Sequence, residues 1–415
     1  MLQLSLSAGR AGGIFLLSTL RSGALLLALL WGGCLPGLGQ KATRPVAAPR
    51  PAARLAAAPQ APRAATGRTS VQYAKGFTIA YAGSCKVVTI LSPFEQKTTA
   101  ARYLLMPRGT ARPAGYPDYR VIETPIRSLV AMSSMHIALA DFLGAADMLV
   151  GVGDLKYASA PRVRQRITEG KIFETGLGKQ LNNELLITRH PDLVMTTGWP
   201  GEGLNSFQTL SAAGVPVMIN SEWVETTPLA RAEWVKVLAV LLNKEDLVNE
   251  KFGQVAREYQ RLTALAQKAN RRPSVVVGLP FKDVWYVPDA DSYMAQFLRD
   301  AGAVYHWDHT KSPSGSLALG FEAVAPVALA AEYWIHTGSL TSKAGLLAQD
   351  ARYAAFASVK TGRVFNNNRR TNAQGANDYW ESGALRPDIV LADLIRILHP
   401  ELLPRGALYY YQPLK

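Results

Sequence analysis

"RVIETPIRSLVAMSSMHIALADFLGAADMLVGVGD", residues 120–154, combines two short apolar runs with a helical pattern between them. Its "SLVAM" is a short apolar run of the kind that forms a buried strand. Either Ser133 or Ser134 can cap a following helix by accepting from the free amides of its first turn. "MHIALADFLG" then has helical spacing and stops at Gly144, a residue type favoured just after a helix C-terminus. Because "DMLVGVG" has the pattern of a further strand, the stretch predicts the strand–helix–strand unit of a parallel sheet.

The same alternation continues along the chain and is interrupted once. "ELLITRHPDLVMTTGW", "SFQTLSAAG" and "VPVMIN" continue it, and "PSVVVGLPF", "SYMAQFLRDAG", "FEAVAPVALA", "AEYWIHTG", "GRVFNN" and "DIVLADLIRILHPEL" resume it later. Between them, "TPLARAEWVKVLAVLL" predicts one amphipathic helix. "KEDLVNEKFGQVAREYQRLTALAQKAN" predicts a second, whose about 25 residues would span roughly 37 Å. The sequence therefore predicts an α/β fold with two lobes of mostly parallel sheet, joined by a single long α-helix.

These patterns divide the chain into seven segments. They are an export signal (1–39), an Ala/Pro/Arg-rich linker (40–70), a small β element before the first lobe (71–119), the N-terminal α/β lobe (120–224), the lobe helix and interlobe backbone helix (225–270), the C-terminal α/β lobe (271–405) and a C-terminal tail (406–415). The linker contains almost nothing large to bury, so the folded region is expected to start at Val71. "GFTIAYAGSCKVVTILSPF" and "ARYLLMPRG" predict that the small element is an antiparallel sheet.

The N-terminus has the features of an export signal. Arg10 and Arg21 precede "GALLLALLWGGCLPGLGQ", an apolar core with small residues after it that is shorter than a membrane span requires. "WGGC" resembles a lipidation signal ending at Cys34, although Trp31 stands where an aliphatic residue is usual; cleavage near "GLGQ" is the alternative. The protein is therefore expected to be exported to the periplasm, with a membrane tether if Cys34 is lipidated.

The net charge of +14 is unevenly distributed and does not indicate a nucleic-acid-binding protein. Residues 1–70 hold eight Arg or Lys and no Asp or Glu, which leaves +6 for residues 71–415, and no RNA- or DNA-binding motif occurs. The two cysteines, Cys34 and Cys85, do not make a disulfide framework or a metal-binding cluster. The sequence also lacks G-x-S-x-G, the P-loop, H-E-x-x-H and G-x-G-x-x-G, which mark several large enzyme classes.

The order of the motifs along the chain resembles a family of transport proteins. The motifs that carry the resemblance are "IETPIRSLVAMSSMHIALADFLGAADMLVGVG", "HPDLVMTTGW", "LSAAGVPVMI", the long helix, "WYVPDADSYMAQFLRDAGAVYHW", "FEAVAPVALAAEYWI" and "ANDYWESGALRPDIVLADLIRILHPEL". As a set they cover most of residues 120–405 and resemble the helical-backbone periplasmic binding proteins of ABC importers for iron–siderophore, haem and cobalamin cargo. The resemblance implies a ligand cleft between the lobes, no catalytic role and no cofactor. It also implies a monomer whose partners are a small-molecule metal chelate and an ABC-importer permease.

In such a fold, ligands bind where strand C-termini and helix N-termini face the cleft. Ser133, Ser134 and His136 take this position after the first strand. Helix amides and the positive end of the helix would there attract a carboxylate, a phosphate or a chelate anion. The alternative is that the serines only cap the helix and that His136 is a packed polar residue.

Aromatic and basic residues at other strand ends complete the predicted ligand site. Trp199 directly follows "DLVMTT", where the family often places a ligand-facing aromatic residue, and Trp223 follows "VPVMIN". The candidates in the second lobe are Trp285, Tyr286, Arg369, Arg370, Tyr379 and Trp380. Aromatic faces suit a flat chelate and guanidinium groups suit its carboxylates or phosphates, but the aromatic side chains also suit a packed interior.

Members of the family dock on their importer through one acidic residue at the tip of each lobe. Glu322 in "GFEAVAPVAL" matches the second-lobe position, where it opens a helix before "AEYWI". Glu202 in "WPGEGLNSF" is the first-lobe candidate, although it lies earlier than the family pattern places this residue. A glutamate in a first helical turn also stabilises the helix itself, which is the alternative for Glu322.

The pair Arg369 and Arg370 favours a ferric siderophore as cargo, because many siderophores are acidic. Cobalamin, another corrinoid, or haem is the alternative cargo for the same role. A different class of function would be a metal-dependent chelatase or hydrolase that uses His306 and His309 of "HWDH", a segment that equally suits a polar loop. A bare Zn²⁺ or Mn²⁺ cargo would call for converging histidines and carboxylates, which the predicted site lacks.

Overall fold

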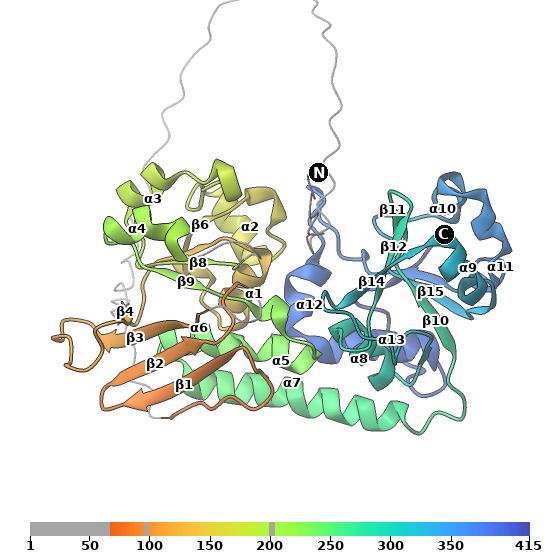
Figure 1. Cartoon of the computed structure of the whole chain (residues 1–415), viewed down its shortest axis with the longest axis horizontal. Coiled ribbons are helices and arrows are strands. Elements are labelled where there is room, and N and C mark those ends of the chain that lie inside the picture. Colours follow the sequence, from red (N-terminus) through yellow and green to blue (C-terminus); the bar gives the residue numbers. More distant parts are fainter. Residues whose placement is uncertain (1–66, 95–98, 199–203) are drawn as a thin grey trace, which may run out of the picture. The chain divides into compact units, whose positions relative to one another are not determined.

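The computed structural model describes residues 67–94, 99–198 and 204–415. The chain divides into two compact units, residues 1–63 and 64–415, and all described residues belong to the second unit. In the described part of this unit, two five-stranded sheets are accompanied by a four-stranded and a three-stranded sheet. The two five-stranded sheets with their helices confirm the predicted α/β organisation in two lobes (Figure 1).

The first lobe is built on a parallel sheet with the strand order β7-β6-β5-β8-β9. Its strands are β5 (Leu129–Ala131), β6 (Leu149–Val152), β7 (Phe173–Glu174), β8 (Leu193–Thr196) and β9 (Val217–Ile219). Its helices are α1 (Ser134–Phe142), α2 (Pro161–Thr168), α3 (Asn183–Arg189) and α4 (Gln208–Ala212). Alternate residues of β5 and β8 enter two different buried clusters, so both faces of the sheet are covered. This is why these strands are apolar runs without polar alternation.

The second lobe has a sheet with the order β13-β10-β15-β16-β17, in which β17 is antiparallel to its neighbour and the other pairs are parallel. Its strands are β10 (Ser274–Val277), β13 (Val304–Tyr305), β15 (Tyr333–Ile335), β16 (Val364–Asn366) and β17 (Gln412–Pro413). Its helices are α8 (Tyr293–Asp300), α9 (Phe321–Ala330), α10 (Lys343–Gln349), α11 (Ala357–Lys360), α12 (Ser382–Leu385) and α13 (Pro387–Leu398). A separate antiparallel sheet consists of β11 (Pro280–Phe281), β12 (Val284–Pro288) and β14 (Ser316–Gly320).

The last ten residues, expected from the sequence to be a tail, pack into the second lobe. They provide β17, and Tyr410 and Tyr411 are buried. The carboxylate of Asp393 on α13 accepts hydrogen bonds from the backbone amides of Tyr409, Tyr410 and Tyr411 at 2.6 to 3.2 Å. The buried carboxylate of a neighbouring helix, 16 to 18 residues earlier in the chain, therefore fixes this segment.

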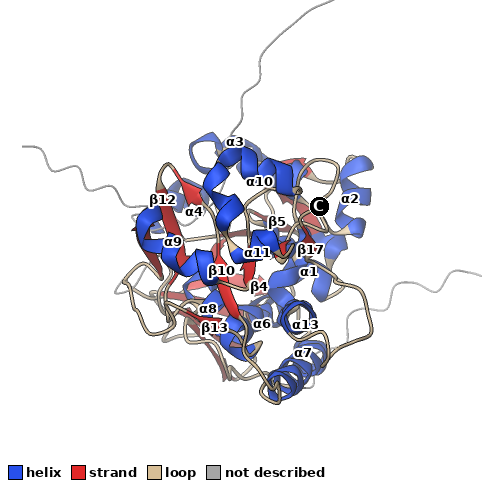
Figure 2. Cartoon of the chain, turned by 90° about the vertical axis from the view of Figure 1, so that its right-hand side faces the viewer, coloured by secondary structure: helices blue, strands red, loops and turns tan. Residues whose placement is uncertain are grey.

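A 22-residue helix, α7 (Glu245–Ala266), runs from the first lobe to the second, as predicted. At 1.5 Å per residue it is about 33 Å long. It packs along α13, and the two helices lie side by side in Figure 2. The preceding helix, predicted as one, is divided at the fully buried Trp234 into α5 (Pro228–Glu233) and α6 (Val235–Leu241).

The small N-terminal sheet has the order β1-β2-β3-β4. Its strands are β1 (Phe77–Ala82), β2 (Cys85–Ile90), β3 (Ala101–Pro107) and β4 (Arg120–Thr124). β1, β2 and β3 pair in the predicted antiparallel way, whereas β4 runs parallel to β3. Residues 120–124, which the sequence analysis gave to the first lobe, therefore belong to this sheet.

The segment before β1 is held by two buried carboxylates. Glu233 accepts hydrogen bonds from the backbone amides of residues 72–74, and Glu225 accepts them from residues 75–76. Thr69 is also buried, and its amide donates to the hydroxyl of Tyr81 at 2.9 Å. Packing therefore starts before Val71. Short 3-10 helices complete the described elements: η1 (Ala146–Met148), η2 (Leu155–Tyr157), η3 (Gly178–Gln180), η4 (Leu204–Phe207), η5 (Glu222–Val224), η6 (Ala351–Ala355) and η7 (Asp378–Trp380).

Candidate functional site

The loops that follow β5 and β6 in the first lobe contact the long loop that follows β16 in the second lobe. The hydroxyl of Ser134 donates to the carbonyl of Trp380 at 3.4 Å. The amide nitrogen Nδ2 of Asn372 donates to the carbonyl of Ala158 at 3.0 Å. Ligands of doubly wound α/β sheets bind outside the carboxyl ends of strands, so this junction between the lobes is the candidate site.

The three predicted residues after β5 take different places. Ser133 is the N-cap of α1, and its hydroxyl accepts from the amide of Met135 at 3.2 Å. Ser134 is half-buried at the lobe junction. His136 is fully buried inside the first lobe, where neither ring nitrogen has a hydrogen-bond partner among the described residues. Burial lowers the pKa of His136 to about 3, so this imidazole is neutral at pH 7.

Of the two aromatic candidates in the first lobe, only Trp223 lies among the described residues. Trp223 lies in η5, directly beyond β9; it is half-buried, and its indole N–H donates to the carbonyl of Gly198 at 2.9 Å. Next to it, burial raises the pKa of Glu222 to about 7, against the opposing charge of Arg231. Three predicted positions lie outside the described residues: Trp199, Glu202 and Cys34.

Neighbouring residues of β12 point to opposite sides. Trp285 is fully buried, donates its indole N–H to the carbonyl of Val277 at 2.9 Å, and packs 5.7 Å from the ring of Trp334. This side chain is part of the second-lobe core, and the structure does not bring it to the lobe junction. Tyr286 lies on the other face of the strand and is 40% exposed, because successive strand residues alternate between faces.

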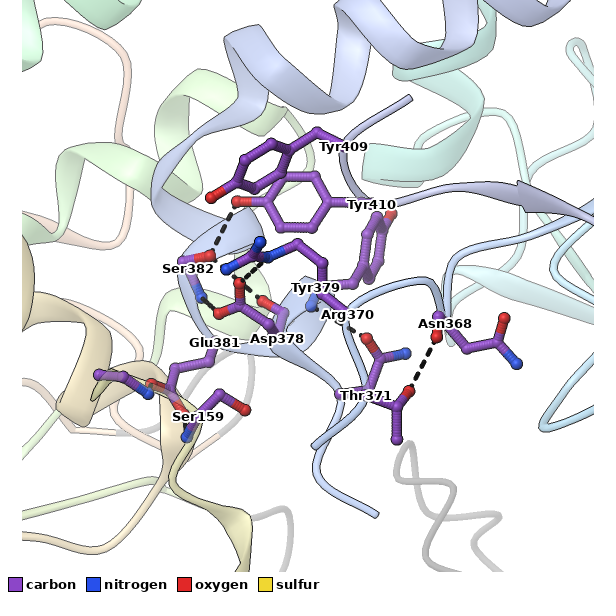
Figure 3. Close-up of polar contacts among 12 residues, drawn as sticks. Ser159, Asn368, Arg370, Thr371, Asp378, Tyr379, Glu381, Ser382, Tyr409 and Tyr410 are labelled. Carbon is purple, nitrogen blue, oxygen red and sulfur yellow. Dashed lines mark hydrogen bonds and ion pairs between the residues drawn. The ribbon is translucent and has the colours of Figure 1, made fainter. Parts of the chain in front are cut away.

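The two predicted arginines, Arg369 and Arg370, have different surroundings. The Nε of Arg370 donates to the carboxylate of Asp378 at 2.6 Å, and its guanidinium lies 4.3 Å from the ring centre of Tyr409 (Figure 3). Arg369 is exposed, and the described residues provide no partner for its guanidinium; its backbone amide donates to the carbonyl of Tyr410. Only Arg369 therefore offers an uncommitted positive charge.

The pair at positions 379 and 380 is also divided. Tyr379 is 4% exposed and lies in a cluster of tyrosines, with its ring centre 5.9 Å from those of Tyr410 and Tyr411. Trp380 is 52% exposed, although its carbonyl is held by Ser134. The tyrosine is thus packed in the second lobe, whereas the tryptophan ring is half exposed and lies perpendicular to the ring of Tyr379, with ring centres 4.9 Å apart.

His336 was not predicted from the sequence, yet it directly follows β15 and joins the tyrosine cluster. Its Nε2 lies 2.5 Å from the hydroxyl of Tyr411, its ring stacks on that tyrosine, and its edge faces Tyr379 at 5.5 Å. Burial lowers the pKa of His336 to about 4, so the ring is neutral at pH 7. Its φ of 59° is uncommon outside glycine, and such conformations gather at functional sites. Applying the strand-end argument to "AEYWIHTG" would have found it.

Glu381 is the second residue that the sequence analysis missed. Its carboxyl oxygens accept from the backbone amides of Ser159 and Ala160, both at 2.7 Å, which lie in the first lobe. The side chain is 1% exposed, and burial raises its pKa to about 8 against the effect of the two amides. In "DYWESG" it directly follows two predicted aromatic residues, but nothing local shows that it reaches the other lobe.

The described residues do not include a group of three or more His, Cys, Asp or Glu that could hold a metal ion. His306 lies edge-on to Trp307, with ring centres 5.0 Å apart, and both His306 and His309 are exposed. Within the same part of the chain, no helix is long and apolar enough to cross a membrane.

A model of the family described as "Periplasmic binding protein" matches residues 129–369. An uncharacterized lipoprotein of Methanocaldococcus jannaschii is 27% identical over 296 residues, which cover 68% of each chain. Helicobacter pylori CeuE with Ni(II) bound is similar in structure, with a TM-score of 0.52 at 16% identity over 72% of this chain and 92% of that one. The periplasmic haem-binding protein HutB of Vibrio cholerae gives 0.50 at 17% identity, over 64% and 98%. At these identities the structural matches show a shared two-lobe fold.

Proposed function

The chain belongs to the periplasmic binding protein family, and we propose that it captures a metal chelate between its lobes and delivers it to an ABC-type permease. Membership of this family makes it a binding protein and not an enzyme, as the sequence indicated. The observation that supports the proposed site is that the two lobes are bonded to each other there: the hydroxyl of Ser134 in the first lobe donates to the carbonyl of Trp380 in the second, and the side chain of Asn372 in the second donates to the carbonyl of Ala158 in the first. Each lobe alone offers only part of this surface.

A ferric siderophore stays the favoured cargo. The exposed ring of Trp380 suits a large flat face, and the guanidinium of Arg369 suits an anionic group on the same ligand. Ion pairing of Arg370 with Asp378 removes one of the two charges on which the sequence argument depended. Cobalamin, a corrinoid of low net charge, remains an alternative because it would depend on the aromatic residues alone.

Haem is the second candidate, and a specific observation favours it. His336 is a neutral imidazole at a strand end, and imidazole is a common axial ligand of haem iron. Its Nε2 is engaged by Tyr411, so the ring would have to release this contact or use its other nitrogen.

Cargo binding is tested by tryptophan quenching with a ferric siderophore, haem and cobalamin. We expect Trp380→Ala and Arg369→Ala each to weaken the preferred cargo by roughly tenfold, the size expected for one stacked ring or one charge-assisted hydrogen bond. Tyr119→Ala and Arg272→Ala are the matched controls and should bind like the wild type. If none of the three ligands binds the wild type, the proposed cargo class is wrong. If cobalamin alone binds and Arg369→Ala has no effect, the corrinoid alternative replaces the siderophore.

The docking residues are proposed to be Glu184 and Glu322. Glu322 is the second residue of α9, which precedes β15, and its side chain is 88% exposed. Glu184 is the second residue of α3, which precedes β8, and it is also exposed. β8 pairs with β5 as β15 pairs with β10, so the two glutamates take equivalent places in the two lobes. We therefore give Glu184 the first-lobe role for which the sequence analysis named Glu202.

Reconstituted uptake tests the docking pair. Glu184→Ala and Glu322→Ala should each reduce transport at least tenfold and leave cargo affinity unchanged, because neither lies among the site residues. Glu250→Ala on α7 is the control for loss of an exposed glutamate. A loss of cargo affinity in either variant would contradict the docking role.

Export and lipidation remain proposals. The relative from Methanocaldococcus jannaschii is named a lipoprotein, which supports lipidation of this chain at Cys34. Mass spectrometry of the membrane-associated protein would detect the acylated N-terminus, and Cys34→Ser should release the protein from the membrane.

A further inference from the structure

One carboxyl group of the second lobe binds the backbone that directly precedes a first-lobe helix. α2 starts at Pro161, and its N-cap residue, Ala160, has no side chain that can accept hydrogen bonds from the first helical turn. The carboxyl group of Glu381 accepts from the backbone amides of Ala160 and of Ser159, which precede the helix, one amide on each oxygen. Figure 3 shows Glu381 reaching Ser159 from the segment that also carries Asp378 and Tyr379. The chain that enters α2 is thus bound by a residue 221 positions away from Ala160.

The surroundings of Glu381 are unusual for a buried acid. The described residues do not provide a cation within ion-pair distance, and the nearby carboxylates of Asp378 and Asp141 act to disfavour its charge. Asp378 is itself neutralised by Arg370. Burying a carboxyl group without a cation is costly, so the two amides and the neighbouring bond from Asn372 to Ala158 are what hold it at the junction.

The residues on either side of the exposed tryptophan are fixed to different lobes. Tyr379 is packed against His336 and Tyr411 in the second lobe. Glu381 is bonded to the first lobe, and between them the carbonyl of Trp380 accepts from Ser134. The backbone of Trp380 is therefore held from both sides while its ring stays 52% exposed.

We propose that Glu381 is a positioning residue: by binding the two amides that precede α2 in the opposite lobe, it sets the distance between the lobes at the cargo site and the orientation of the Trp380 ring. This role rests on the proposed function, because Trp380 is placed there as a cargo contact. Holding both lobes and the ring before cargo arrives reduces the ordering that binding would otherwise require. Loss of these two hydrogen bonds should therefore weaken cargo binding without removing any cargo contact.

The test compares Glu381→Gln with Glu233→Gln in the full-length protein. A glutamine has one acceptor oxygen and one NH₂ group, so Glu381→Gln can accept from only one of the two amides. Glu233 is likewise fully buried and accepts backbone amides, but those of residues 72–74, away from the lobe junction. Three quantities are measured: hydrogen exchange at Ser159 and Ala160, the emission of Trp380 obtained by difference from Trp380→Phe, and the affinity for ferric siderophore, haem and cobalamin.

We expect Glu381→Gln to speed exchange at Ser159 and Ala160 by roughly tenfold or more, to shift the Trp380 emission, and to weaken the preferred cargo by a similar factor. Glu233→Gln should lower the melting temperature and leave all three quantities as in the wild type. Unchanged exchange and emission in Glu381→Gln would overturn the proposal, as would an equal effect of both variants on affinity. Exchange and emission are measured without cargo, so failure of all three ligands to bind would count against the proposed function and not against the interlobe hydrogen bonds of Glu381.

Discussion

His136 in the first lobe and His336 in the second both follow a central strand, but they end in different environments. His136 is on the first turn of α1, whose residues from Met135 to Ala140 are all buried, and its two ring nitrogens have no hydrogen-bond partner among the described residues. His336 is the residue immediately beyond β15, has a left-handed backbone, and contacts two tyrosines at the lobe junction. The comparison indicates that a residue directly after a strand, such as His336, lies near the lobe junction. A residue about one helical turn further on, such as His136, is instead enclosed in the core.

The largest expected effect is on acid stability, and both histidines contribute to it in the same direction. Both have a pKa below the usual 6.5, about 3 for His136 and about 4 for His336. Below pH 6.5 these histidines are therefore protonated in the unfolded chain while they are still neutral in the folded one. Above pH 6.5 neither histidine lowers the free energy of unfolding. Below pH 6.5 the free energy of unfolding falls with the pH, until about pH 3 for His136 and about pH 4 for His336. The loss approaches about 1.4 kcal/mol per pH unit for each group in its window.

Removing one histidine at a time separates these contributions. Relative to the wild type, His136→Leu should gain stability progressively between pH 6.5 and pH 4, because an apolar side chain has no proton to take up. Urea unfolding at several pH values measures the difference. Carboxyl groups with raised pKa, such as Glu381 at about 8 and Glu222 at about 7, act in the opposite direction and cancel in this comparison. A stability difference that does not change with pH would show that His136 titrates normally.

An intermediate effect is expected on cargo affinity. His336→Phe keeps a ring in the tyrosine cluster but removes the nitrogen bonded to Tyr411, and it should weaken the preferred cargo by roughly five- to tenfold. His136→Leu should bind cargo like the wild type, because the side chain is enclosed in the first lobe. Isothermal titration gives both values, and an equal loss in the two variants would contradict the distinction between them.

The smallest effect is a reversal of the usual preference between alanine and glycine. At position 336 the φ of 59° suits glycine, so His336→Gly should be more stable than His336→Ala by about 0.5–1 kcal/mol. At position 136, inside α1, the order should be the opposite by a similar amount. Thermal unfolding of the four variants measures both differences, and the same order at both positions would mean that the backbone at His336 is not left-handed in solution.

The candidate site was predictable where a local rule applied and was missed where it did not. Ser133 caps α1 as its place before an apolar helical run indicated, and Trp380 is exposed at the lobe junction. Trp285 was predicted as a ligand contact like Trp380, yet it lies in the core, because neighbouring residues of β12 point to opposite faces and its neighbour Tyr286 takes the exposed one. His336 could have been found by applying the strand-end rule in the second lobe.

The sequence by itself determined the elements of this protein, their order, the long connecting helix and the family. These depend on periodicity, on caps and on the order of motifs, all of which are properties of neighbouring residues. Only the folded structure shows that the last residues join a sheet, that Arg370 pairs with Asp378, and that Glu381 binds the amides preceding a helix of the other lobe. These contacts depend on how separate segments come together: β17 pairs through its backbone with β16, and Glu381 reaches amides 221 and 222 positions away, so the geometry exists only after both lobes have folded.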